Sequence, residues 1–262
     1  MKQLGAALIA IGLLAAPAWG QDWAKAKLKQ SSRHGEWVKV KQGGREVNSF
    51  VVYPEVKDKA TAVVVIHEIF GLSDWAQLVT DELAAAGYIA IAPDLLSGMG
   101  PKGGGTDEIG DKVMKAIRDL PANQITADLN AVADYVKKLP ACNGKLAVCG
   151  FCWGGGQAFR YATTNPDLKA AFVFYGPGPD TGLDKIQCPV YGFYGGDDNR
   201  IDATLPATEK AMKAAGKTFE PVIYAGAGHG FMRAGEQPDA KEDNRKGRTE
   251  AWERWKMLLK KI

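Results

Sequence analysis

The sequence predicts an α/β protein built on a mostly parallel sheet of about eight strands, with helices covering both faces. Two observations carry this prediction. Apolar runs such as "ATAVVVI" lack the alternation of a half-exposed strand, which is typical of strands buried on both faces. These runs alternate with segments of helical spacing, and that order indicates connected βα units in which successive strands run parallel.

The elements follow in a regular order along the chain. Residues 37–40 and 46–54 alternate polar and apolar side chains around the turn "KQGGR", which predicts an antiparallel opening hairpin. Glycine or charged turn residues bound the later candidates. We predict further strands over residues 60–68, 88–94, 145–150, 169–176, 189–198 and 219–226, and helices over residues 75–87, 107–120, 126–139, from Gly155, over 205–215 and over 249–262.

Residues 1–20 are predicted to be an export signal. Lys2 precedes an apolar run that is short for a membrane span, and Ala18 and Gly20 suit a cleavage site. The mature chain is expected to begin at Gln21, with a cut after Ala18 as the alternative. Residues 21–262 are then predicted to form a single domain of a periplasmic or secreted protein, without a membrane anchor after signal cleavage.

The composition of the chain limits the classes of partner and cofactor that we expect. The formal net charge is +3 at pH 7, and the basic stretch over residues 25–45 is interpreted as a solvated lead-in to the first strand. So weak an excess of positive charge argues against a nucleic-acid partner. His34, His67 and His229 are scattered, so neither a metal nor another cofactor is predicted. A monomer acting on a small molecule is expected.

Candidate catalytic residues gather in the loops that follow the predicted strands. In open parallel sheets, the ligand site lies at the carboxyl ends of the strands. The loops after the third, fifth, seventh and eighth strands carry Glu68, Cys152, Asp198 and His229, respectively. We therefore expect these four side chains to lie close together.

Cys152 stands at the centre of "GFCWG", between a strand and a helix. In a nucleophile elbow, the nucleophile sits on a sharp turn whose neighbours must be small, and Gly150 and Gly154 meet that requirement. The positive end of the following helix would favour the thiolate. The alternative is structural, because cysteine is often a small buried apolar residue.

His229 is the candidate base, since it alone of the three histidines lies in a glycine-rich loop at the end of a strand. Asp198 is preferred to Asp197 as the acid that fixes the imidazole tautomer. The chain order nucleophile, acid, histidine is that of the α/β-hydrolase fold. That fold supplies oxyanion donors from the backbone N–H groups of Trp153 and Ile69.

Together, "HEIFG", "PDL", "GFCWGG", "YGGDDNRI" and "GHGFMR" resemble the dienelactone hydrolase family, the cysteine-using branch of the α/β-hydrolases, over essentially the whole mature chain. The resemblance implies that Cys152, Asp198 and His229 form a triad and that Glu68 interacts with the thiol and shares in its activation. It also implies two arginines that grip a substrate carboxylate. One matches Arg233, whereas Ser97 and Gly98 stand where the other is expected.

The leading hypothesis is an exported hydrolase that cleaves small esters or lactones through a thioester on Cys152. Tyr175 and Trp153 are candidates to line its pocket, and the loop over residues 97–106 either shapes or gates the pocket or is a plain surface connection. One alternative is a thiol-disulfide oxidoreductase that uses Cys149 and Cys152. Another is a binding protein that keeps the fold without the chemistry.

The other two cysteines are not expected to form a disulfide. Cys142 and Cys188 precede the fifth and seventh strands. The sixth strand should lie between them, so their separation would be about 10 Å, which is too far for a disulfide.

Overall fold

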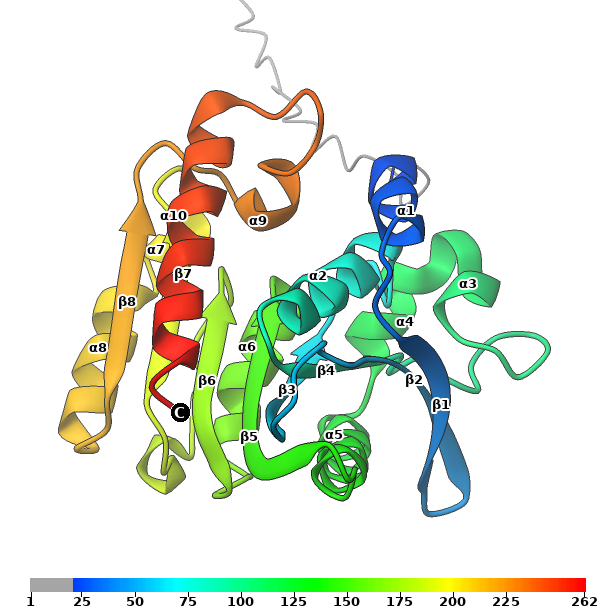
Figure 1. Cartoon of the computed structure of the whole chain (residues 1–262). Coiled ribbons are helices and arrows are strands. Elements are labelled where there is room, and N and C mark those ends of the chain that lie inside the picture. Colours follow the sequence, from blue (N-terminus) through cyan, green and yellow to red (C-terminus); the bar gives the residue numbers. More distant parts are fainter. Residues whose placement is uncertain (1–20) are drawn as a thin grey trace, which may run out of the picture.

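The computed structural model describes residues 21–262, and the predicted signal peptide lies outside the described residues. Eight strands form one sheet in the order β1-β2-β4-β3-β5-β6-β7-β8 (Figure 1). The strands are β1 (Gly35–Gln42), β2 (Arg45–Val52), β3 (Ala60–Ile66), β4 (Ile89–Pro93), β5 (Cys142–Phe151), β6 (Leu168–Phe174), β7 (Val190–Gly195) and β8 (Phe219–Tyr224).

The sheet is mixed at one edge and parallel elsewhere. β1 pairs antiparallel with β2 around the predicted two-glycine turn, and β2 pairs antiparallel with β4. All pairs from β4 to β8 are parallel. The predicted α/β fold with a mostly parallel sheet is therefore confirmed. The strands β3, β5, β7 and β8 run parallel, so their carboxyl ends lie at the same end of the sheet. The loops that follow these four strands therefore lie together at that end.

Ten α-helices accompany the sheet in the described residues. They are α1 (Asp22–Lys29), α2 (Asp74–Ala85), α3 (Thr106–Ile109), α4 (Val113–Asp119), α5 (Ala122–Lys137), α6 (Trp153–Ala162), α7 (Asn199–Asp202), α8 (Leu205–Ala214), α9 (Phe231–Ala234) and α10 (Glu242–Leu259). Short 3₁₀ turns over Gly110–Lys112 and Leu183–Lys185 complete the set.

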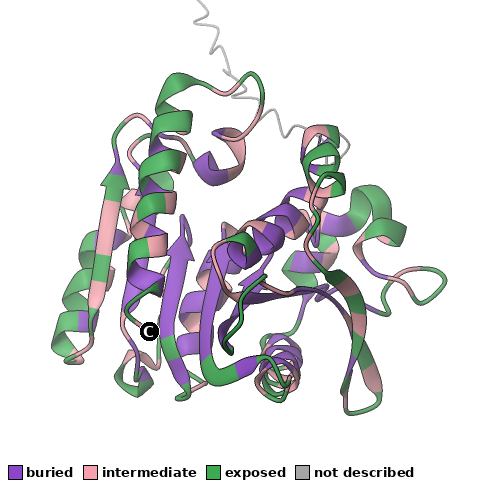
Figure 2. Ribbon diagram, viewed as in Figure 1, coloured by how far each residue is buried: buried purple, intermediate pink, exposed green. Residues whose placement is uncertain are grey.

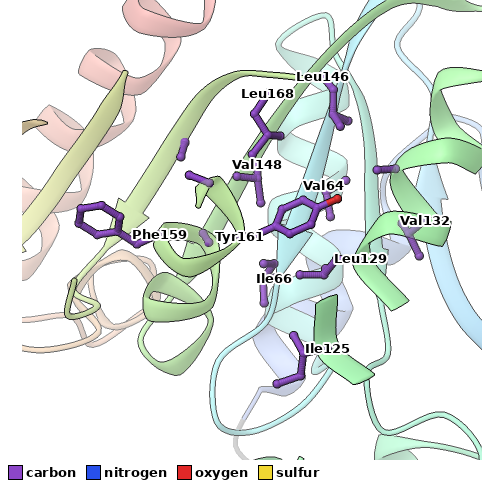
Figure 3. Close-up of a cluster of buried hydrophobic side chains, with 14 of the residues drawn as sticks. Val64, Ile66, Ile125, Leu129, Val132, Leu146, Val148, Phe159, Tyr161 and Leu168 are labelled. Atoms are coloured by element: carbon purple, nitrogen blue, oxygen red, sulfur yellow. The ribbon is translucent and has the colours of Figure 1, made fainter. Parts of the chain in front are cut away.

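Helices on each face bury the central strands completely. On one face, α5, α6 and α8 cover a core that includes Val64, Val148 and Leu129 (Figure 3). On the other, α1, α2 and α10 cover a second core around Trp75 and Trp255. Figure 2 shows the middle strands in the buried colour, as their unbroken apolar runs predicted.

Three local features differ from the sequence prediction. The lead-in contains a helix, α1, which packs on α2 by burying Ala24. The helix after the elbow begins at Trp153, two residues earlier than predicted. The predicted helix over residues 107–120 is broken at Gly110, whose φ of 64° is outside the helical range.

All four cysteines are free thiols. β6 lies between β5 and β7, so Cys142 and Cys188 begin or precede strands that are not neighbours. Among residues 21–262, no helix is both long and apolar enough to cross a membrane.

Candidate active site

Cys152 occupies a sharp turn between β5 and α6. Its φ is 57°, a left-handed conformation that is rare for a residue with a side chain. The turn is possible because its neighbours lack a Cβ. A Cβ on Gly150 would lie 2.0 Å from the Gly154 carbonyl oxygen, and one on Gly154 would lie 2.3 Å from the His67 carbonyl oxygen. Glycine therefore allows β5, α6 and the end of β3 to approach closely at this turn.

Loops from three strands bring Cys152, His229 and Asp198 together. The Nε2 atom of His229 lies 3.1 Å from the Cys152 sulfur, and its Nδ1 atom is hydrogen-bonded to the Asp198 carboxylate. Asp198 is buried, whereas Asp197 is exposed, so the structure places the second aspartate against the histidine. The imidazole thus lies between the thiol, whose proton it can take, and the carboxylate, which orients it. This is the arrangement that activates a thiol nucleophile.

The electrostatics favour a charged imidazole. Burial opposes protonation of His229, but hydrogen bonds to Asp198 and Cys152 outweigh it and raise the pKa of the imidazole to about 9. Cys152 also occupies the N-cap of α6, where the helix dipole stabilises negative charge. Near neutral pH, His229 is therefore held as an imidazolium beside the Cys152 sulfur.

Two backbone N–H groups could stabilise an oxyanion. Trp153 opens α6, so its N–H has no acceptor within that helix. Ile69 lies in the loop after β3, and its N–H donates no hydrogen bond to any residue in 21–262. Both donors are therefore available to a ligand, as a tetrahedral intermediate needs.

Comparisons with known proteins identify the family of this chain. The sequence profile described as "Dienelactone hydrolase family" matches residues 47–262. The chain belongs to the dienelactone hydrolase family. It is 33% identical over 202 residues to a Yersinia pestis protein named "Putative carboxymethylenebutenolidase", covering 72% of this chain and 75% of that protein. A protein of the same name from Saccharolobus solfataricus is 32% identical over 254 residues, covering 84% and 95%.

A solved structure supports the same assignment. The crystal structure titled as a putative dienelactone hydrolase from Klebsiella pneumoniae has a TM-score of 0.77 and 27% identity, over 88% of this chain and 100% of that one. The chain therefore has the α/β-hydrolase fold and is a carboxymethylenebutenolidase-like hydrolase.

Within this dienelactone hydrolase family site, Glu68 is hydrogen-bonded to Arg233, whereas the resemblance implied an interaction with the thiol. Its carboxylate accepts a 2.7 Å hydrogen bond from Nε of Arg233, and in the described residues no hydrogen bond joins it to Cys152. The reason is charge. Glu68 is 3% exposed, and a buried carboxylate needs a cationic partner. Arg233, expected to contact a substrate carboxylate, is thus paired with Glu68, and its guanidinium lies 5.2 Å from the Phe70 ring centre.

Tyr175 was expected to line the substrate pocket, but it is fully buried. It follows β6 with a φ of 41°, and its ring packs edge-on against His229, 5.1 Å between ring centres. Burial raises the pKa of its hydroxyl well above the ordinary value, and the charge of Glu68 adds to this effect. Tyr175 therefore supports the imidazole instead of lining a pocket. No sequence pattern signals its backbone conformation.

A guanidinium does lie near Gly98, although the sequence has no arginine there. Arg45, at the start of β2, donates to the carbonyl oxygens of Ser97 at 2.6 Å and Leu95 at 2.9 Å, and it pairs with Asp128 at 3.2 Å. These contacts commit Arg45 to holding the loop. The expected second substrate arginine is therefore not replaced by it.

The loop over residues 97–106 is held at both ends. The Asp94 carboxylate accepts from the backbone and the hydroxyl of Thr106, at 2.7 and 2.8 Å. Glu108 accepts from the backbone N–H groups of Lys102 and Gly104. The loop thus has a defined shape beside the site, which favours the role of shaping a pocket over that of a plain connection.

The site gives less support to metal binding or to thiol-disulfide exchange. No cluster of three or more His, Cys, Asp or Glu side chains within residues 21–262 could hold a metal ion. Cys149, the potential redox partner of Cys152, lies inside β5 and is fully buried, and burial raises its pKa well above the ordinary value. A thiol so shielded is a poor exchange partner.

Proposed function

We propose that this protein is an exported hydrolase that cleaves small carboxylic esters or lactones through a thioester on Cys152. The observation that carries the proposal is the 3.1 Å approach of His229 Nε2 to the Cys152 sulfur, with Asp198 on the other ring nitrogen. The family assignment supports hydrolysis, and the available Ile69 and Trp153 N–H groups support acyl chemistry.

The reaction would proceed in two steps. The Cys152 thiolate attacks the carbonyl carbon, a C–S bond forms, and the N–H groups of Ile69 and Trp153 stabilise the oxyanion. Collapse breaks the C–O bond, and the His229 imidazolium gives its proton to the leaving alkoxide. Neutral His229 then takes a proton from water, which attacks the thioester, releases the acid and restores the thiolate.

The first experiment is a screen of short esters and lactones with the wild type and a Cys152→Ala control. Iodoacetamide should label Cys152 ahead of the other three thiols, and activity should fall in proportion to that labelling. Mass spectrometry should detect an acyl adduct on the Cys152 peptide after mixing with a slow ester. Activity that survives complete labelling of Cys152 would refute the thioester mechanism.

Export and the monomeric state belong to the same proposal. The supporting observation for export is the sequence of residues 1–20, with its apolar run and small residues at positions 18 and 20. Periplasmic fractionation with N-terminal sequencing tests it, and the expected first residue is Gln21. Light scattering on the purified mature protein tests the monomer. A cytoplasmic, uncleaved chain would contradict export and leave the hydrolysis proposal standing.

A further inference from the structure

A cavity of about 360 Å³ lies where the loop after β3 meets α1, α2 and α3. Its lining includes Phe70 and Leu72 from that loop, Thr106 from α3, Lys25 from α1 and Trp37 from β1. This volume is within the range of small-molecule pockets, which begins at about 300 Å³. Lys25 and Trp37 precede residues 47–262, the part of the chain that matches the family.

The cavity adjoins the loop that carries the proposed oxyanion donor Ile69. Leu72 is three residues beyond Ile69, the proposed oxyanion donor, and three residues span at most about 10 Å. The loop turns tightly, because the Gly71 N–H donates to the Glu68 carbonyl at 3.1 Å. The ring centre of Phe70 lies 5.2 Å from the guanidinium carbon of Arg233, and Phe70 also lines the cavity. One ring thus separates the Glu68–Arg233 pair from this space.

The apolar part of the lining is aromatic. Trp37 is 54% exposed on the edge strand β1, and its ring centre lies 5.5 Å from that of Phe50. Trp37 also borders a second cavity of about 410 Å³, whose lining includes Gly104 and Gly105. An exposed tryptophan that faces a pocket is a platform for stacking a flat ring.

The charged side chains that line the cavity disfavour a ring that carries a negatively charged group. Asp74 and Asp107 line it together with a single ammonium, that of Lys25. Burial raises the pKa of Asp74, Lys25 counteracts this, and the neighbouring charges of Asp22 and Asp107 raise it further. Two carboxylates against one ammonium leave the cavity without a free cation to hold a ligand carboxylate. An uncharged ring avoids this repulsion.

The walls are joined to one another. The Thr106 hydroxyl accepts from the Leu72 N–H at 3.0 Å and donates to Asp94 at 2.8 Å, which ties the loop after β3 to the start of α3. The Gln21 side chain accepts from the Trp75 N–H at 2.9 Å and fixes the start of α1 against α2. The cavity is therefore formed before a ligand arrives, which favours affinity.

We propose that this cavity binds an uncharged aromatic ring of the ester substrate while its carbonyl group lies at Cys152. The assignment rests on the proposed hydrolase function and adds its substrate class. Trp37 supplies the stacking surface, and Phe70 separates the ring from the ion pair. Trp37, which lies outside the family match, thus contributes to specificity.

Two measurements test the assignment with three variants. Trp37→Ala removes the stacking surface, Gln77→Trp fills the cavity from α2, and Ile223→Ala is the control, because Ile223 is 53% exposed on the opposite edge strand β8. The first measurement is calorimetric binding of 2-naphthol to these variants in the Cys152→Ala background. The dissociation constant should rise about tenfold in Trp37→Ala and Gln77→Trp, and it should not change in Ile223→Ala.

The second measurement is kcat/KM for 2-naphthyl acetate and for methyl 2-naphthoate, each divided by that for methyl acetate. These esters carry the ring on the alcohol and the acyl side. At least one ratio should fall about tenfold in both cavity variants. If both cavity variants keep the wild-type kcat/KM ratios and the wild-type affinity for 2-naphthol, the aromatic site is refuted. The proposed hydrolysis is not affected by that result. If the wild type hydrolyses no ester but naphthol binding still depends on Trp37, the proposed hydrolysis fails and the ring site stands.

Discussion

Arg233 in α9, the short helix that follows β8, and Glu68 in the loop after β3 form an ion pair, with 2.7 Å between Nε and Oε2. The Glu68 side chain is 3% exposed and that of Arg233 is 18% exposed. Coulombic attraction to Glu68 raises the pKa of Arg233 above its already high value. The pair therefore joins α9 to the loop after β3 through a charge interaction that is shielded from water.

Replacing Arg233 by Met should destabilise the fold by about 3 kcal/mol, because it leaves the Glu68 carboxylate buried without a cation. Urea unfolding at pH 7 measures this. Lys39→Met is the matched control, since Lys39 and Glu46 form an exposed pair at 3.3 Å that should contribute less than about 1 kcal/mol. The double variant Arg233→Met/Glu68→Gln should recover part of the loss. Equal effects of Arg233→Met and Lys39→Met would contradict a shielded pair.

The same pair predicts substrate choice. An anionic substrate must compete with Glu68 for Arg233, and Gly98 stands where a second arginine was expected. We expect a higher kcat/KM for the methyl ester of a carboxylated lactone than for the free acid. Loss of activity in Arg233→Met beyond its effect on stability should be confined to the acid. A strong preference for the free acid, abolished in Arg233→Met, would show that one arginine suffices.

Asp198→Asn should lower kcat by ~100-fold or more while the fold remains intact, because His229 loses the carboxylate that fixes its tautomer. Asp197→Asn is the control. Its exposed side chain makes no hydrogen bond to another described residue, so it should change kcat little. Circular dichroism checks the fold of both variants. Reversed effects would assign the acid to Asp197.

The pKa of His229, raised to about 9, predicts an alkaline limit to activity. The leaving alkoxide takes its proton from the imidazolium, so kcat/KM for an alkyl ester should fall as pH rises through about 9. The stabilisation from this raised pKa is complete below about 6.5, the unfolded value, and is lost as pH rises through about 9. A pH profile that stays flat from about 8 to 10.5 would contradict this assignment.

Gly150→Ala should destabilise the protein by about 1–3 kcal/mol and reduce activity, because the new Cβ would lie 2.0 Å from the Gly154 carbonyl oxygen. Gly44→Ala offers the control, since no atom lies within 4 Å of a Cβ built there. It should change the free energy of unfolding by less than about 0.5 kcal/mol. Thermal unfolding and ester hydrolysis measure both effects. An undisturbed Gly150→Ala protein would mean that the elbow tolerates a wider turn.

The sequence by itself determined the parallel sheet and the positions of Cys152, Asp198 and His229 in chain order. It could do so because these signals are local: buried strands appear as unbroken apolar runs, and a turn that admits no Cβ requires glycine. The α1 helix escaped prediction, because a helix of eight residues is marginal by itself and its order comes from packing against α2.

Only the tertiary structure decided which charges pair. Glu68 and Arg233 lie 165 residues apart, and Arg45 reaches the carbonyl of Ser97 from 52 residues away. Their partners depend on where the loops meet in space and on how little water remains there, and neither is written in residue spacing. The fold likewise buries Tyr175 against the His229 ring. It also brings together the separate segments that line the cavity beside Phe70. Chain order thus determined the reacting groups, whereas the folded arrangement determined what surrounds and neutralises them.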